Sequence, residues 1–267
     1  MSTDRGYALV TGAANGIGRA IAIELARNGF GIIATGRNAS GLKELSVEIG
    51  KLNGDRIHTL EVDLLADGAI DRVVAFATEH GRPLTCMVNN AGLANWGLFE
   101  WQDLEVQLRM MRLNMEVPVV LTKKLLPLLK KQKPAYILNV SSMTAFHALA
   151  SMAIYASSKA FLLRWSRSLR LELKGQVNVT ALCPGSVNTG FTKNADMLAM
   201  DDLAKKFGTP PEPVAKAAVA GMLKNKALVI PGASNQFTVK LQNLVPDSVT
   251  ESVASGIYLK RLPKRKN

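Results

Sequence analysis

Residues 11–18 read Thr-Gly-Ala-Ala-Asn-Gly-Ile-Gly and connect an apolar run at residues 7–10 to an amphipathic pattern at residues 17–28. Glycines let the backbone turn sharply and approach a ligand closely, and the first turn of a helix presents free N–H groups at the positive end of its dipole. A strand, a glycine turn and a helix in this order predict a pyrophosphate site. Taken alone, such a turn could also be a tight strand-to-helix connection without a ligand.

The rest of the chain continues this alternation of short apolar runs and longer helical patterns. The expected strands cover residues 7–10, 31–35, 57–62, 86–88, 136–140, 177–182 and 227–230. The expected helices cover residues 17–28, 42–52, 69–78, 103–131, 154–174 and 214–224. The strand runs are continuously apolar, as in sheets that helices cover on both faces. The pattern predicts an α/β fold with a single Rossmann-like, doubly wound parallel sheet of about seven strands and helices on both faces.

The length of 267 residues suits one large domain, and 48% hydrophobic residues exclude wholesale disorder. We expect residues 1–230 to form this domain and residues 231–267 to form a helical, basic extension packed on it. Phe237, Leu241, Leu244 and Val245 are spaced as an apolar helical stripe within the extension. The interval 184–213 is rich in Gly, Pro and Asn, and we expect it to be a lid with a short helix around residues 195–207.

The charge balance limits the classes of partner. Lys and Arg number 33 against 21 Asp and Glu, a net charge of +12, which suits acidic small molecules, anionic lipid or nucleic acid. The basic clusters at residues 123–133 and 260–266 have two interpretations, a solvated surface or a docking surface for an acidic carrier or a lipid. Aromatic residues are not interleaved with the basic ones, so we expect no nucleic-acid partner. The three histidines lack metal-ligand spacing, so we expect no metal.

The compartment is predicted from two cysteines and from the absence of targeting signals. Cys86 and Cys183 lie in strand-like runs and are expected to be buried free thiols of a reducing compartment. The sequence shows no secretory signal pattern and no apolar stretch of the ~20 residues that a transmembrane helix needs. A cytoplasmic protein without a transmembrane segment is therefore expected, with peripheral membrane contact through the tail left open.

Further motifs follow the glycine turn in a fixed order. They are Asn90-Ala91-Gly92 after the fourth expected strand, Asn114, Ser142, Tyr155-x3-Lys159 and Pro184-Gly185 with Thr189. With the Thr-Gly-x3-Gly-x-Gly turn, this set resembles the short-chain dehydrogenase/reductase family over roughly residues 6–230. The resemblance implies a nicotinamide-dependent oxidoreductase, with Asn114, Ser142, Tyr155 and Lys159 as its catalytic residues.

The chemistry of the tyrosine and the lysine agrees with this resemblance. Tyr155 and Lys159 are spaced i and i+4 on a helix, so their side chains share one face. A phenol with a pKa of ~10 is a slow acid–base catalyst at neutral pH, and a neighbouring ammonium should lower that pKa. The resemblance implies that Tyr155 is the general acid, that Ser142 polarises the substrate oxygen, and that Lys159 also binds the nicotinamide ribose.

Asn114 can be examined through Pro118, which lies four residues later and has no N–H. The carbonyl of Asn114 should therefore lose its intrahelical partner, and the helix should kink there. By resemblance this carbonyl would hold a water that passes protons towards Lys159. The alternative is a proline that a long helix merely tolerates.

The preferred nicotinamide cofactor is predicted from the end of the second expected strand, which reads Gly36-Arg37. A carboxylate there would bind the ribose hydroxyls of NAD, whereas a guanidinium can bind the 2′-phosphate of NADP(H). NADP(H) is therefore favoured, although a single arginine could also be a solvated surface residue. Asp63 would contact the adenine or else cap the following helix. The cofactor-binding residues expected from the motifs are Gly12, Asn15, Gly16, Ile17, Gly18, Arg37, Asp63, Leu64, Asn90, Ala91, Gly92, Tyr155, Lys159, Pro184, Gly185, Val187 and Thr189.

The expected substrate pocket is mostly apolar and adaptable, which favours a hydrophobic substrate, although these residues could also be lid packing. Its expected walls are Leu93, Trp96, Met143, Thr144, Ala145, Phe146, Phe191, Lys193, Met197, Leu198 and Met200. We therefore expect an NADP(H)-dependent oxidoreductase that interconverts a ketone and a secondary alcohol. The alternatives are a 3-oxoacyl-carrier or 3-oxoacyl-CoA reductase and, in another class, a non-catalytic NADPH-binding sensor or scaffold. By resemblance we expect a homodimer or a homotetramer.

Overall fold

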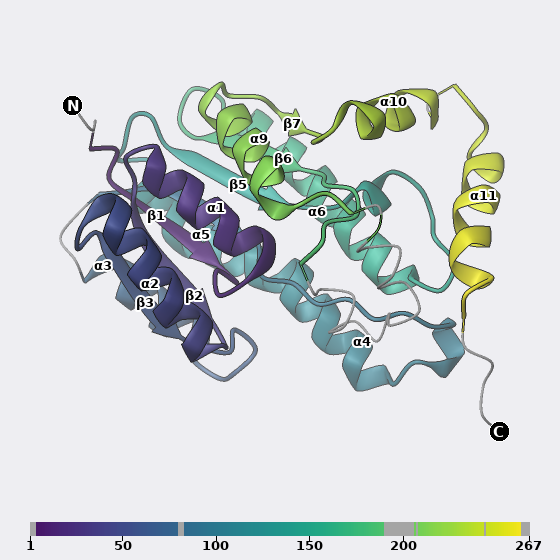
Figure 1. Cartoon of the computed structure of the whole chain (residues 1–267), viewed down its shortest axis with the longest axis horizontal. Coiled ribbons are helices and arrows are strands. Elements are labelled where there is room, and N and C mark those ends of the chain that lie inside the picture. Colours follow the sequence, from purple (N-terminus) through teal and green to yellow (C-terminus); the bar gives the residue numbers. More distant parts are fainter. Residues whose placement is uncertain (1–3, 80–82, 190–205, 207, 243, 263–267) are drawn as a thin grey trace.

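The computed structural model describes residues 4–79, 83–189, 206, 208–242 and 244–262. Its sheet has seven parallel strands in the order β3-β2-β1-β4-β5-β6-β7 (Figure 1). The strands are β1 (Tyr7–Thr11), β2 (Gly31–Gly36), β3 (Ile57–Glu61), β4 (Leu84–Asn89), β5 (Tyr136–Val140), β6 (Asn178–Leu182) and β7 (Leu228–Val229). The order reverses between β1 and β4, and this reversal opens a crevice at the carboxyl ends of the two strands. The predicted doubly wound parallel sheet is confirmed.

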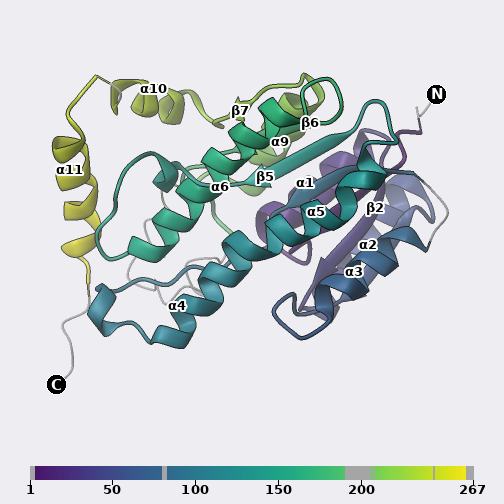
Figure 2. The same ribbon diagram turned by 180° about the vertical axis from the view of Figure 1, so that it is seen from behind.

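Helices cover both faces of the sheet, as Figures 1 and 2 show from opposite sides. One face packs against α1 (Gly16–Arg27), α2 (Ala39–Asn53) and α9 (Pro211–Leu223). The other packs against α3 (Ala69–Thr78), α5 (Val117–Leu129) and α6 (Ala153–Glu172). In β1, Ala8 and Val10 enter the first core while Tyr7 and Leu9 enter the second. Successive residues of a strand point to opposite faces, so a strand between two cores is continuously apolar.

The helical segment expected over residues 103–131 is present, and it is interrupted at its middle. Helix α4 (Leu104–Met111) is followed by a π-helical turn, Arg112–Glu116, and then by α5. The Val117 N–H bonds to the Arg112 carbonyl, five residues back, and Pro118 is the second residue of α5. Proline cannot donate a backbone hydrogen bond, and π-bulges often form where the regular ladder is interrupted. The irregularity predicted from Pro118 is therefore confirmed.

The chain after β7 forms two helices at one end of the molecule, α10 (Ala233–Gln242) and α11 (Asp247–Leu259), the latter yellow in Figure 1. The expected four-residue apolar stripe is wrong, because α10 ends before Leu244 and because Phe237 and Leu241 are exposed. Residues 190–205 and 207, which include the expected lid helix, lie outside the described residues. None of the helices within the described ranges is long and apolar enough to cross a bilayer.

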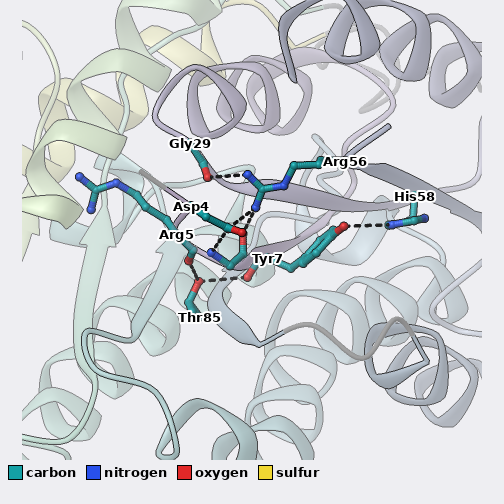
Figure 3. Close-up of polar contacts among 8 residues, drawn as sticks. Asp4, Arg5, Tyr7, Gly29, Arg56, His58 and Thr85 are labelled. Carbon is teal, nitrogen blue, oxygen red and sulfur yellow. Dashed lines mark hydrogen bonds and ion pairs between the residues drawn. The ribbon is translucent and has the colours of Figure 1, made fainter. Parts of the chain in front are cut away.

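The amino ends of the strands carry a group of polar side chains that bond to each other and to the backbone (Figure 3). Arg56, just before β3, donates to the Gly29 carbonyl at 3.2 Å and pairs with Asp4. The Tyr7 hydroxyl lies 3.3 Å from His58 Nε2, and the Arg56 guanidinium lies 5.7 Å from the Tyr7 ring centroid. These contacts join the starts of β1 and β3, so this edge of the sheet is closed by its own side chains.

Candidate active site

The turn between β1 and α1 leaves no room for a side chain at its three glycine positions. Gly12 and Gly16 have φ values of +67° and +56°, in the left-handed region that favours glycine. A Cβ on Gly18 would lie 2.3 Å from Asn90 Nδ2. The Asn90 amide fills that space and donates to the carbonyls of Thr11 and Gly12 at 2.9 and 3.1 Å. The turn is thus fixed from the end of β4, across the point where the strand order reverses.

The first turn of α1 is available to an anion. Asn15 is the N-cap, but its side chain makes no capping hydrogen bond, and the first turn contains no acidic residue. The leading N–H groups and the positive dipole end therefore remain open to a pyrophosphate. The loop after β6 approaches this turn, because a Cβ on Gly16 would lie 3.0 Å from Thr189 Cβ.

A cleft of about 1130 Å³ runs along the carboxyl edge of the sheet. Every residue that the sequence predicted to bind the cofactor lines this cleft, and Ser142 lines it as well. By the strand order, Asp63 and Arg37 after β3 and β2 lie at one end, and Ser142 after β5 lies towards the other with Tyr155 and Lys159; the glycine turn after β1 lies between them. The size, the glycines and the open helix N-terminus all fit a dinucleotide.

The end of β2 carries a free cation and no carboxylate. Gly36 packs closely on Ala14, since a Cβ at Gly36 would lie 3.2 Å from Ala14 Cβ. Arg37 follows, exposed, and its guanidinium makes no ion pair or hydrogen bond with any residue in the described ranges. Arg19, in contrast, is held by Glu48 at 2.9 Å. Arg37 is therefore the cation at this end of the cleft that can turn towards a phosphate.

Asp63 shapes the turn after β3. Its Oδ1 accepts from the Leu65 N–H at 3.0 Å, and its Oδ2 lies 3.7 Å from an Arg109 nitrogen. Helix α3 begins only at Ala69, after Gly68, so the alternative that Asp63 caps this helix is wrong. The side chain instead stabilises a local turn and faces the cleft.

The proposed proton-transfer group lies at the carboxyl end of β5 and the start of α6. Ser142 caps the short 3-10 helix Met143–Phe146 by accepting from the Thr144 N–H at 3.1 Å, and it also hydrogen-bonds to Tyr155. Lys159 is buried and donates from Nζ to the Val140 carbonyl at 3.1 Å. Its Nζ lies 5.8 Å from the Tyr155 ring centroid. The three side chains therefore meet beside the cleft, as the spacing predicted.

Burial dominates the pKa values of this group. It raises the pKa of Tyr155 to about 12, although the hydrogen bond from Ser142 opposes this shift. Burial also lowers the pKa of Lys159 to about 8, so the ammonium remains mostly protonated at neutral pH. The expected lowering of the Tyr155 pKa by Lys159 is not found: burial raises this pKa, and the effect that opposes burial comes from Ser142.

Asn114 does not line the cleft but supports it from behind. Its side-chain amide exchanges two hydrogen bonds with the Leu93 backbone, each 2.9 Å long, and Nδ2 also donates to Ser158 Oγ at 3.0 Å. Ser158 Oγ donates in turn to the Tyr155 carbonyl at 2.8 Å. A Cβ on Gly92 would lie 3.1 Å from Asn114 Oδ1 and 3.3 Å from Lys159 Nζ, which shows how closely these groups pack. The amide thus joins the end of β4 to the first turns of α6.

Only some of the residues expected to form the substrate pocket line the cleft. Leu93, Met143 and Thr144 line the cleft. Trp96 does not, because it is buried below and donates from Nε1 to Ser151 Oγ at 3.0 Å. Ala145 and Phe146 pack instead on the core around Leu163 and Cys183. The other five lie outside the described residues, namely Phe191, Lys193, Met197, Leu198 and Met200.

Part of the cleft wall was missed in the sequence. It comes from the loop before α6 and from the tail, namely His147, Leu149, Met152, Asn235, Thr238 and Tyr258. A signal was present, since Ala254, Tyr258 and Leu262 recur every four residues. These three residues pack on the buried cluster that contains Tyr155, so the tail forms one side of the cleft.

Comparisons with known proteins agree with this geometry. The family described as short chain dehydrogenase matches residues 6–197. Ketoacyl reductase HetN from Nostoc sp. is 30% identical over 240 residues, which are 89% of this chain and 82% of that protein.

Solved structures share the fold. A short-chain dehydrogenase from Sphingobium yanoikuyae in complex with NADPH has a TM-score of 0.78 at 24% identity and covers 98% of each chain. A short-chain dehydrogenase/reductase from Burkholderia phymatum in complex with NAD has a TM-score of 0.82 at 20% identity and covers 100% of this chain and 99% of its own. The chain belongs to the short-chain dehydrogenase family of oxidoreductases.

Proposed function

We propose that this protein is an NADP(H)-dependent oxidoreductase that interconverts a ketone and a secondary alcohol on a hydrophobic substrate. The observation that carries the proposal is the hydrogen-bonded pair Ser142–Tyr155, with Lys159 beside it, in the cleft that the glycine turn also lines. A polarising hydroxyl, a phenol and an ammonium are the groups that carbonyl reduction requires.

When bound, a reduced nicotinamide supplies the hydride that adds to the carbonyl carbon. Ser142 donates a hydrogen bond to the carbonyl oxygen and polarises it. Tyr155 transfers its phenolic proton to that oxygen as negative charge develops there, which yields the neutral alcohol. Lys159, held at the Val140 carbonyl, stabilises the resulting phenolate and would bind the ribose of the cofactor. In the oxidation direction, the same phenolate removes the proton from the alcohol.

The pKa of Tyr155 sets the requirement for this chemistry. Moving it from about 12 to near neutrality takes about five pKa units, or roughly 7 kcal/mol at ~1.36 kcal/mol per unit. Lys159 alone leaves the phenol at the high value. We therefore propose that Tyr155 becomes a competent base only in the complex, where the positive charge of an oxidised nicotinamide would lower its pKa further.

The supply of protons is the role that we propose for Asn114. Its side chain is fully used in bonds to Leu93 and Ser158, so only its backbone carbonyl can contribute. That carbonyl lies in the π-helical turn before Pro118, where the regular ladder is broken. A water held there would connect Lys159 to solvent.

The preference for NADP(H) is proposed from Arg37. Its unpaired guanidinium follows a strand end without a carboxylate, and a guanidinium binds a phosphate in fork geometry. Solved structures with this fold hold NADPH in one case and NAD in another, so the choice rests on Arg37 alone.

The test is reduction of a panel of ketones with NADPH, comparing the wild type with Tyr155→Phe. We expect kcat/KM to fall by about a thousandfold, because the variant lacks only the transferable proton. Tyr136→Phe is the matched control, since it removes a phenol from the sheet core outside the cleft. Equal NADPH binding without turnover by either protein would favour a cofactor-binding sensor or scaffold instead.

A second substrate class, a 3-oxoacyl group on a carrier protein or coenzyme A, is favoured by one observation. Lys130, Lys131 and Lys133 are exposed at the end of α5 and could contact an acidic carrier. The relative named ketoacyl reductase acts as a precedent. A kcat/KM for acetoacetyl-CoA far above that for simple ketones, with a steep salt dependence, would select this class.

We also propose an assembly and a location. Val106 and Leu108 on α4 and Phe161 on α6 are exposed apolar residues, and burying them in a homodimer or homotetramer would remove them from water. The two buried free thiols, Cys86 and Cys183, suit the reducing cytoplasm. Residues 231–262 are proposed to fold with the rest of the domain.

A further inference from the structure

Two polar side chains face the catalytic end of the cleft and take no part in the proposed proton transfer. His147 lies in the loop after the 3-10 helix, and Tyr258 lies on α11 of the tail. Neither the His147 Nε2 atom nor the Tyr258 hydroxyl has a hydrogen-bond partner among the residues that the structure describes. Both side chains are half-buried, so these two atoms are open to a ligand in the cleft.

The orientation of His147 is set from the tail. Gln242, the last residue of α10, places its amide Nε2 at 3.3 Å from His147 Nδ1. An amide nitrogen can only donate, so Nδ1 accepts and the ring carries its proton on Nε2. Burial lowers the pKa of His147, while Glu251 opposes this shift. The ring is therefore a neutral N–H donor at neutral pH, with a carboxylate close by.

Tyr258 is held against the catalytic tyrosine by the packing of α11. Ala254 and Leu262, four residues before and after Tyr258, pack with it on the cluster that contains Tyr155. The Ser255 hydroxyl accepts from the Ala150 N–H at 3.0 Å and fastens α11 to the loop before α6. The two phenols are close enough that charge on Tyr258 would raise the pKa of Tyr155. Burial raises the pKa of Tyr258 itself, so its hydroxyl also remains a neutral donor.

We propose that His147 and Tyr258 form a polar subsite that binds a second, uncharged oxygen of the substrate. The inference rests on the proposed function and narrows its substrate class to ketones and secondary alcohols that carry another carbonyl, ester or hydroxyl oxygen on an apolar chain. Two neutral donors suit an uncharged acceptor, and the Glu251 carboxylate beside His147 would repel a carboxylate. Leu149 and Met152, which line the same end of the cleft, would contact the apolar part.

The test compares matched pairs of ketones with NADPH as reductant. Ethyl acetoacetate is paired with methyl pentyl ketone, and ethyl levulinate with methyl hexyl ketone, because each pair has the same chain length and differs in the ester group. The measured quantity is the ratio of kcat/KM for the ester to kcat/KM for the plain ketone. We expect Tyr258→Phe and His147→Phe each to reduce this ratio about tenfold for at least one pair, through KM, as for the loss of one buried hydrogen bond.

Gln242 is a positioning residue, and its variant separates orientation from packing. Gln242→Leu should reduce the same ratio as His147→Phe does, and the double variant should lose no more than His147→Phe alone. Tyr136→Phe is the control that removes a phenol elsewhere. A ratio that stays at the wild-type value in all three variants would overturn the subsite while reduction of the plain ketones still supports the proposed function. Failure of the wild type to reduce any of the four ketones would overturn both.

Discussion

The two edges of the sheet use polar side chains in opposite ways. At the amino edge, Arg56, Asp4, Tyr7 and His58 bond to each other and to the backbone, so these side chains are held by contacts within the protein (Figure 3). At the carboxyl edge the cleft is lined by an open helix N-terminus and by unpaired donors. The amino edge is built for stability and the carboxyl edge for binding.

The carboxyl edge also holds ionisable groups at a cost to stability. Lys159 is buried with a lowered pKa, and Tyr155 is buried with a raised one. Both shifts mean that the charged forms needed for catalysis are disfavoured in the protein alone. Functional sites often retain such unfavourable groups because the ligand completes them.

The largest effect is expected for removal of the Lys159 ammonium, which we propose to act in catalysis. Lys159→Met should lower kcat/KM for ketone reduction by about a thousandfold, because the variant lacks the buried cation beside the phenolate of Tyr155. Steady-state kinetics with saturating NADPH would measure it. Lys124→Met is the control, since Lys124 pairs with Asp71 on the surface at 2.7 Å. Near wild-type activity of Lys159→Met would show that the reaction does not need the Lys159 ammonium.

The same substitution should change the pH dependence of stability. Lys159 has a pKa of about 8 in the folded protein, against 10.5 for an ordinary lysine, so between these two pH values the unfolded chain holds the extra proton. The free energy of unfolding of the wild type should therefore rise with pH from about pH 8 to about pH 10, by roughly 3 kcal/mol relative to Lys159→Met. Urea unfolding of both proteins at several pH values would measure this difference. If the free energies of unfolding of the two proteins changed with pH in parallel, burial would not lower the pKa of Lys159.

The adenosine end of the cleft should respond through cofactor choice. Arg37→Ala should raise KM for NADPH by roughly tenfold to a hundredfold, as for loss of a charge-assisted contact, and change KM for NADH far less. Kinetics with both cofactors would show the split. Arg27→Ala, which removes an exposed arginine of α1, is the control. Equal losses for both cofactors would contradict a 2′-phosphate contact.

The parts of the site that the sequence predicted are those with strict local requirements. Gly12 and Gly16 need left-handed backbone, and Tyr155 and Lys159 need one helix face, so spacing alone locates them. Pro118 likewise predicted an interruption of the helix, although not the π-helical turn that follows Met111.

The parts that the sequence did not predict depend on where distant segments pack. Tyr258 reaches the cleft only because α11 folds back on the loop before α6. The four-residue spacing of Ala254, Tyr258 and Leu262 indicates an apolar helix face but not the surface on which that face packs. Trp96 was misplaced for the same reason, since its apolar ring suited either a pocket wall or the core beneath it. The apolar stripe predicted in the tail was wrong because Phe237 and Leu241 have the spacing of a buried helix face and yet remain exposed.

The smallest effect is expected at the amino edge, and it should appear in stability rather than activity. Arg56→Ala removes the pair with Asp4 and the bonds to the Gly29 and Gly6 carbonyls, of 3.2 and 3.3 Å, from a side chain that is 17% exposed. We expect the free energy of unfolding to fall by about 2 kcal/mol, most of it from the carbonyl bonds, because Asp4 is largely exposed and the ion pair is screened. Activity per folded molecule should not change, since a five-residue strand separates this edge from the cleft by roughly 15 Å. Urea unfolding and kinetics on the same preparation measure both quantities, and a loss of kcat/KM without a loss of stability would mean that the two edges are not separate.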